Sequence, residues 1–313
     1  MQDISVVNVI VPIFMVIGIG YLAVRTELMP KSVIPGMGRF VLYFCLPALI
    51  FTTLTTTSIA TAITPYYLIA YGAGSLLAYL LGFAFSKGVS KSSTSEAGLN
   101  ALGMSQSNSA FVGYPVLLQV FGTLPAAAFT MTLMVENLVI MPLALMVLEL
   151  SRALSGGGST RQVISSFVRR LVTQPILLAI VLGIVYSLLG LGLPEIVSSG
   201  LGFLAEASAG VALFVIGGSL VGISIKGDVW KISWVTVGKL CIHPLLVALM
   251  VWLLPPFDRQ LQVIAILIAS MPMLSIYPVV AGNYLDPARY AATLVVATLL
   301  SFVSISIVLA VLF

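Results

Sequence analysis

Four ionisable side chains fall inside long apolar runs of this 313-residue chain: Glu136, Glu206, Lys239 and His243. An ionisable group at the centre of a membrane-spanning helix costs about 2.5–3.5 kcal/mol on insertion scales, so each is a functional candidate by default. A carboxylate removed from water holds a proton more readily. Glu136 lies about mid-run, so we predict that it takes up and releases a coupling proton, with Lys239 and His243 as helpers.

Structural roles stay open for each of these groups. Glu136 could be a protonated carboxyl that hydrogen-bonds between two helices. Glu206 could pair with Lys239, a structural role that we expect more than a part in coupling. Lys239 could instead extend its side chain towards the membrane surface, and His243 could be a hydrogen-bonded packing residue.

Two apolar runs, 97–121 and 261–284, are interrupted by proline, glycine and polar residues. A proline inside a helix removes a hydrogen bond and clashes with the preceding turn, at a cost of about 3 kcal/mol. At membrane depth, the freed backbone groups are tolerated only where they line a cavity or are buried in protein. We therefore expect helix breaks at Gly113, Pro115, Pro272 and Pro278, whose exposed N-terminal amides would favour an anion.

The polar side chains beside these breaks, together with the neighbour of Glu136, are the candidates for contact with a substrate. They are Gln106, Ser107, Asn108, Tyr114, Asn137, Ser275 and Tyr277. Proline and glycine are common in membrane helices, so either break alone could be structural. Two breaks at related positions favour the functional interpretation.

The elements that must position these residues are membrane-spanning helices. The chain is 60% apolar and 8% charged, whereas soluble domains are about 45–50% apolar and about 25% charged. A span needs roughly 20 apolar residues. We predict an all-α polytopic membrane protein with ten spans, at 4–24, 35–56, 65–86, 97–121, 126–149, 171–190, 196–224, 231–254, 261–284 and 288–312.

Sequence similarity between the two halves predicts an internal repeat. The matching segments, at offsets of 162–165 residues, are 46–51 with 209–214, 114–116 with 277–279, Pro12 with Pro175, 18–21 with 183–186, and 125–126 with 287–288. Five spans per half is an odd number, so the halves must be inverted, as in many secondary transporters. We predict repeats at 1–150 and 171–313, joined by a cytoplasmic linker at 151–170.

The distribution of basic residues predicts the orientation. Twelve of the 14 Lys and Arg residues lie in the odd-numbered loops, and cytoplasmic loops carry the excess of such residues. Both termini should therefore lie outside a membrane that we expect to be the bacterial cytoplasmic (inner) membrane.

Several function classes are disfavoured. One histidine and two separated cysteines give no zinc site, and neither a phosphate-binding loop nor a nucleophile–base pair is visible. We predict no enzyme, no cofactor, no metal, and no nucleic-acid partner, because no basic patch is interleaved with aromatic residues. Gly218 and Gly222 are spaced for close helix contact, which permits a homodimer.

The order and spacing of these motifs resemble the auxin efflux carrier family, in its bacterial malonate-carrier-like branch. That family is related to the PIN-formed auxin exporters of plants and to bile-acid/sodium symporters. The resemblance spans the whole chain and is carried by Pro12 with 18–21, by 46–51, by 108–115, by Asn137 with Pro142, by 210–214 with Gly217 and Leu220, by 239–240 with 244–245, and by the interrupted ninth span.

The resemblance implies a scaffold of spans 1, 2, 6 and 7, through which a homodimer could form. A mobile transport domain would comprise spans 3–5 and 8–10, with spans 4 and 9 crossing at their prolines and substrate between the domains. Asn108 would contact a substrate carboxylate. Ser107 and Asn108 also match a sodium-binding pair of the symporters, but the acidic residue that those proteins use in span 9 is missing between Leu261 and Asn283.

We therefore expect a secondary active transporter of a small organic anion, such as malonate, another dicarboxylate or an auxin-like carboxylate. Protons are favoured over sodium as the coupling ion, because Glu136 is the only mid-span acid in the expected transport domain. A sodium-coupled symporter, and a channel or sensor without coupled transport, remain the alternatives.

Overall fold

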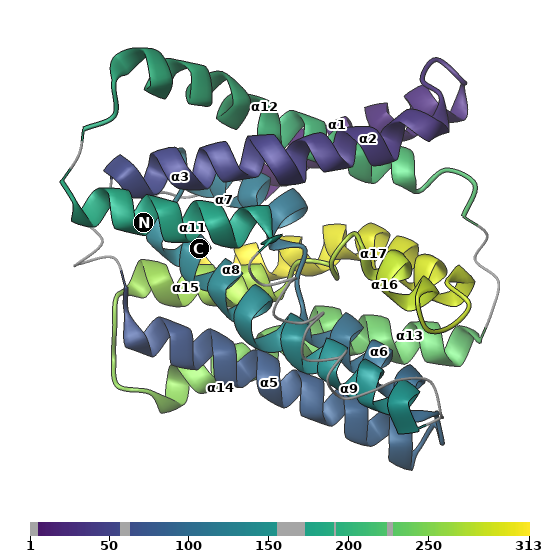
Figure 1. Cartoon of the computed structure of the whole chain (residues 1–313). Coiled ribbons are helices and arrows are strands. Elements are labelled where there is room, and N and C mark those ends of the chain that lie inside the picture. The colour runs from purple at the N-terminus through teal and green to yellow at the C-terminus, as the bar shows by residue number, and fades with distance from the viewer. Residues whose placement is uncertain (1–5, 57–62, 155–172, 191, 224–227) are drawn as a thin grey trace. The chain divides into compact units, whose positions relative to one another are not determined.

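The computed structural model describes residues 6–56, 63–154, 173–190, 192–223 and 228–313 (Figure 1). Within these ranges the chain is helical, and its one strand-like pairing is an isolated bridge between Ser107 and Met273. Seven described helices are long and apolar enough to cross a membrane, and three shorter apolar helices accompany them. The predicted all-α membrane protein is confirmed at this level, while ten spans and inverted repeats stay predictions. Most of the 151–170 linker lies outside the described residues.

The described α-helices agree with the expected spans to within a few residues, except where spans are interrupted. They are α1 (Val6–Arg25), α2 (Ile34–Phe40), α3 (Leu46–Thr56), α5 (Pro65–Gly88), α6 (Thr94–Ser105), α7 (Tyr114–Phe121), α8 (Ala126–Val135), α9 (Met141–Leu154), α11 (Pro175–Leu188), α12 (Glu195–Ser219), α13 (Val229–Val237), α14 (His243–Leu253), α15 (Arg259–Ala269), α16 (Tyr277–Gly282) and α17 (Ala288–Leu312). Side chains of Ser93, Asp228 and Asp258 accept hydrogen bonds at the N-termini of α6, α13 and α15, which explains why these helices begin there.

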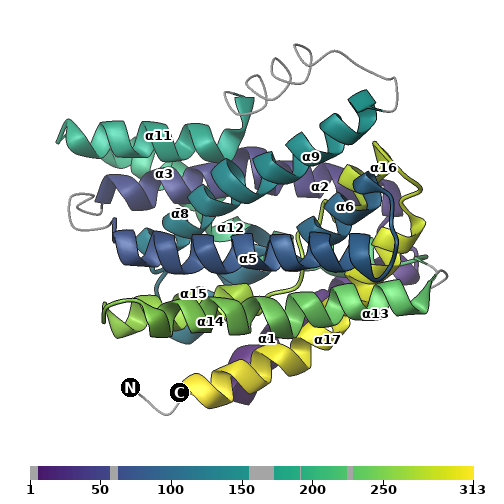
Figure 2. The same ribbon diagram turned by 90° about the horizontal axis from the view of Figure 1, so that it is seen from below.

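Contacts group the chain into two compact units. The first unit comprises Met1–Thr64, Ala110–Met131 and Leu171–Gly222, and the second comprises Pro65–Ser109, Thr132–Arg170 and Ile223–Phe313. In the second unit, α5 and α14 lie side by side in both views (Figure 2). This unit holds both helix interruptions and all three predicted coupling residues.

Four helices contain a π-helical turn that ends two residues before a proline. The turns and prolines are Val41–Cys45 before Pro47, Ser109–Gly113 before Pro115, Glu136–Ile140 before Pro142, and Gly238–Ile242 before Pro244. Proline lacks an N–H and its ring clashes with the carbonyl four residues earlier. A wider turn relieves this clash, so these prolines lie in helices that continue past them.

The break predicted at Gly113 and Pro115 is therefore wrong in position. The helix is continuous from Ser109 to Phe121, and the interruption lies earlier, at residues 106–108. In the second half, Pro272 lies in the interruption at 270–276 and Pro278 lies in the first turn of α16. Pro278 is tolerated there because the first turn of a helix does not use its N–H groups.

In the first unit, α1 and α12 approach so closely that glycine is required on both helices (Figure 1). A Cβ at Gly20 would overlap the backbone of Phe214, and one at Gly217 would overlap the carbonyl oxygen of Ile17. Gly218 packs against Ile34 and Val24 of the same chain. The small-residue pair predicted to permit a dimer is therefore used, at Gly218, for packing within the chain.

A Gly217→Ala variant should be destabilised by about 1–3 kcal/mol or more, because the new methyl group meets backbone that cannot rotate away. Thermal unfolding in detergent measures the effect. Gly210→Ala is the matched control on the same helix, since a Cβ there meets nothing within 4 Å. In that control, the free energy of unfolding should rise by about 0.5–1 kcal/mol, because alanine favours the helix more than glycine does. Equal melting temperatures for the two variants would contradict the close approach of α1 and α12.

Candidate functional site

The two helix interruptions of the second unit lie against each other. Ser107 forms the isolated antiparallel bridge with Met273. The backbone N–H of Asn108 donates to the carbonyl oxygen of Pro272 at 2.8 Å. Each interruption thereby satisfies part of the backbone that the other exposes, as a buried polar backbone requires.

Side chains also join the interruptions. The Asn108 amide nitrogen donates to Ser275 Oγ at 2.7 Å. Asn108 is buried and Ser275 is half-buried. The structure thus brings two of the predicted substrate contacts together, from residues 167 positions apart.

Glu136 points its carboxylate at this junction. It lies on the π-helical turn Glu136–Ile140, and its Oε1 atom accepts hydrogen bonds from Ser109 Oγ at 2.6 Å and from the Tyr71 hydroxyl at 2.7 Å. A buried carboxylate with several donors is suited to carry a negative charge.

Lys239 approaches the same junction from the π-helical turn Gly238–Ile242. Its ammonium nitrogen lies 2.8 Å from Ser107 Oγ, 2.8 Å from the Ala269 carbonyl oxygen and 2.7 Å from His243 Nδ1. A lysine ammonium has three N–H donors, and these three acceptors use all of them. Because His243 Nδ1 accepts a hydrogen bond from the ammonium, the ring hydrogen lies on Nε2. Nε2 donates it to Ser75 Oγ, and these two atoms are 2.9 Å apart.

These contacts form one connected group that we call the buried polar network: Tyr71, Ser75, Ser107, Ser109, Glu136, Lys239 and His243. Every member is at most 3% exposed, so its charges interact in a medium of low dielectric constant. Within the described residues Glu136 and Lys239 form no direct ion pair. They are linked through Tyr71 and Ser107, whose hydroxyl oxygens are 3.4 Å apart. The arrangement can hold opposite charges apart and pass a proton between hydroxyl groups.

Comparison with known proteins decides the class of this chain. The family described as "Membrane transport protein" matches residues 5–309. The chain belongs to this family. The resemblance to auxin efflux carriers is thereby confirmed, and the members of the membrane transport protein family are transporters rather than enzymes.

Two relatives are similar to this membrane transport protein. A protein of Rhizobium meliloti (strain 1021) named "Putative malonate transporter" is 24% identical over 305 residues, which cover 96% of this chain and 94% of the relative. The "Lysosomal cholesterol signaling protein" of Mus musculus is 24% identical over 250 residues, which cover 76% of this chain and only 29% of that longer protein.

Three other predicted site residues of this membrane transport protein, Tyr114, Asn137 and Gln106, are not members of the buried polar network. Tyr114 belongs to the first unit, where its ring packs on Phe129 at 5.9 Å between centroids. Asn137 donates to the Leu133 carbonyl of its own helix. The Gln106 side-chain oxygen is buried and has no hydrogen-bond partner among the described residues.

Two further expectations are corrected or refined by the contacts. The predicted pairing of Glu206 with Lys239 is wrong, because all three Lys239 donors have other acceptors and Glu206 is exposed. Tyr277 is fully buried, but its ring stacks edge-on against Tyr290 at 5.4 Å and its hydroxyl faces Gly103.

Sequence reasoning missed the hydroxyl groups of α5. Tyr67, Tyr71 and Ser75 recur every four residues, so they share one face of the helix. All three are fully buried, and Tyr67 bonds to Thr132 at 2.6 Å. A polar stripe at helical spacing within an apolar run was the signal that could have found them.

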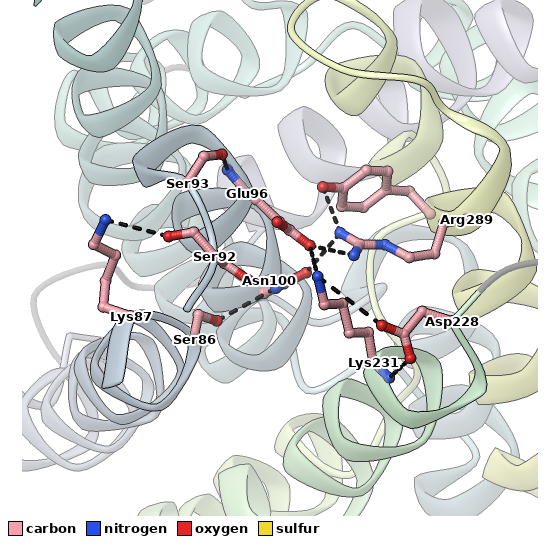
Figure 3. A network of polar contacts seen from close by, with 10 residues as sticks. Ser86, Lys87, Ser92, Ser93, Glu96, Asn100, Asp228, Lys231 and Arg289 are labelled. Atoms are coloured by element: carbon pink, nitrogen blue, oxygen red, sulfur yellow. Dashed lines mark hydrogen bonds and ion pairs between the residues drawn. The ribbon is translucent and has the colours of Figure 1, made fainter. Parts of the chain in front are cut away.

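A second polar cluster of the same unit joins α6, α13 and α17 (Figure 3). The Glu96 carboxylate accepts from Lys231 Nζ at 2.7 Å and from the Arg289 guanidinium. Arg289 also donates to the Asn100 side-chain oxygen at 3.4 Å and to the Tyr290 hydroxyl at 2.7 Å. Lys231 and Arg289, which are among the basic residues of the odd-numbered loops, therefore connect three helices through Glu96.

This cluster should make stability depend on acid pH. Burial raises the pKa of the Glu96 carboxyl, but the hydrogen bonds and charges of Lys231 and Arg289 outweigh it, and the pKa lies below its usual value of 4.5. The stabilisation is therefore present above about pH 4.5 and is lost as pH falls further through the lowered pKa. In Glu96→Gln the melting temperature should be lower at neutral pH and should fall less on acidification. In the control Glu27→Gln, at an exposed position, the melting temperature should depend on pH as it does in the unmodified chain.

Proposed function

We propose that this membrane transport protein is a secondary active carrier of a small organic anion, with malonate or a related dicarboxylate as the first candidate. The observation that carries the proposal is the meeting of two helix interruptions at a buried network that contains Glu136 and Lys239. Intramembrane charges beside broken helices are typical of transport sites. The name of the Rhizobium meliloti relative supports malonate.

The substrate carboxylate would be bound by Asn108 and Ser275. Their mutual hydrogen bond supplies an amide donor and a hydroxyl donor at one place, and each can turn to a carboxylate oxygen without leaving a buried group unpaired. An auxin-like carboxylate would use the same donors. The carboxylate contacts therefore do not distinguish between these substrates, and a screen of carboxylates must identify the rest of the molecule.

Coupling would run through Glu136, which takes a proton from one side of the membrane and releases it to the other. Alternating access would be provided by ten spans arranged as two inverted five-helix repeats. In that arrangement the scaffold is spans 1, 2, 6 and 7, and the mobile domain is spans 3–5 and 8–10. The excess of basic residues in the odd-numbered loops supports termini outside the cytoplasmic membrane.

Uptake of labelled malonate into proteoliposomes, with pH and sodium gradients imposed separately, tests the proposal. Accumulation driven by the pH gradient alone is the expected result. Accumulation that requires sodium would support the sodium-coupled alternative, and dissipation of gradients without accumulation would support a channel. No uptake of any carboxylate by folded protein would contradict the carrier.

A sensor is the second candidate, because the mouse relative is named as a signaling protein. A sensor would bind its ligand without moving it. Binding measured by thermal stabilisation, in protein that shows no flux in the same proteoliposomes, would favour this function over transport.

A further inference from the structure

The Lys239 ammonium lies where three acceptors from different parts of the second unit converge. Ser107 Oγ belongs to the first interruption, the Ala269 carbonyl ends α15 at the second interruption, and His243 Nδ1 lies one turn along from Lys239. Lys239 is 0% exposed. Its position is therefore fixed by contacts with both interruptions and with His243.

The same position has the chemistry of a site for a monovalent cation. The last carbonyl groups of a helix lack partners within the helix and carry the negative end of its dipole. Ala269 is the last residue of α15, and the Ser107 hydroxyl adds a second oxygen. In broken membrane helices, unwound backbone carbonyls and helix C-termini are the groups that coordinate coupling cations.

We propose that Lys239 is a tethered cation that permanently fills the cation position between the two interruptions. The protein then needs no sodium or potassium ion there, and removal of the ammonium leaves a site that accepts a small ammonium ion such as methylammonium. This inference rests on the proposed function only for its consequence, which is transport independent of sodium.

The surroundings supply the counter-charge. Glu136 is the one acidic side chain in the buried polar network, and it reaches Lys239 through Tyr71 and Ser107. His243 lies between Lys239 and Ser75 of α5 and accepts from the ammonium. A cation at this place is therefore balanced by a carboxylate, and removal of the cation leaves that carboxylate without a counter-charge.

The test is thermal unfolding of purified protein in detergent, at constant ionic strength, with sodium, potassium or methylammonium chloride. The unmodified chain should melt at the same temperature in all three salts. Lys239→Ala should melt lower and should regain much of the loss as methylammonium is raised, as expected for a ligand that binds the folded state. If this variant cannot be obtained folded, Lys239→Ser, which also vacates the position of the ammonium group, answers the same question.

Lys231→Ala is the matched control, because it removes a lysine eight positions earlier that bonds to Glu96 at the second cluster. Methylammonium should not restore the melting temperature that the Lys231→Ala variant loses. A melting temperature of the unmodified chain that rises with sodium, or a Lys239 variant whose loss no small cation restores, would overturn the proposal. Neither measurement uses uptake, so absence of malonate transport would count against the proposed function and not against this site.

Discussion

The Glu136→Gln variant should fail to accumulate substrate in response to a pH gradient. Glutamine can still accept the hydrogen bonds from Ser109 and Tyr71, but it cannot take up and release a proton. The change also leaves the Lys239 ammonium buried without a counter-charge. Removal of one partner of a direct buried ion pair typically costs about 3–5 kcal/mol. Glu136 and Lys239 are linked only through Tyr71 and Ser107, so a smaller loss of stability should accompany the loss of coupling.

Pairing Glu136→Gln with a second substitution separates these effects. Adding Lys239→Met removes the unbalanced charge, so the double variant should be more stable than the sum of the single losses predicts. Glu149→Gln is the control for the chemistry, because that half-buried carboxylate also accepts from a tyrosine, Tyr284, at 2.6 Å. Uptake in Glu149→Gln should stay coupled. Full pH-driven accumulation in Glu136→Gln would remove Glu136 from the mechanism.

The sequence was sufficient to predict the helical membrane class and the position of most spans. Runs such as 288–312 are apolar on all sides, and such runs have few alternatives to a span. Proline was less informative. Pro115, Pro142 and Pro244 each follow a π-helical turn that accommodates them, whereas the first interruption, at 106–108, contains no proline. A helix breaks where other groups can satisfy its backbone, and that depends on contacts distant in sequence.

The members of the site could be named from sequence more readily than their partners. Glu136, Lys239 and His243 are conspicuous because charge is rare in the apolar runs. Their connections pass through Tyr71 and Ser107, and the Lys239–Ser107 bond alone joins positions 132 residues apart. Serine and tyrosine are ordinary in membrane helices, so no local feature distinguishes the hydroxyls that bridge two charges from those that bond their own helix, as Ser105 does with Ala101.

Asn108→Ala should raise the half-saturating substrate concentration about tenfold to a hundredfold. A hydrogen bond to a charged group contributes about 1.5–3 kcal/mol, and each 1.4 kcal/mol is a factor of about ten in affinity. The fold should survive, because the bond from Asn108 to the Pro272 carbonyl is made by the backbone N–H and persists in alanine. Initial rates of uptake over a range of substrate concentrations measure the effect.

The control for this substitution is Asn283→Ala, at an exposed position directly after α16 in the same unit. It should leave the half-saturating concentration unchanged. Ser275→Ala tests the geometry independently, because it removes the hydroxyl that Asn108 donates to at 2.7 Å while leaving the amide in place. A smaller rise than in Asn108→Ala is expected there, since the amide alone can still bind a carboxylate. Unchanged kinetics in Asn108→Ala would place the substrate elsewhere, and the two interruptions would then serve the cation position alone.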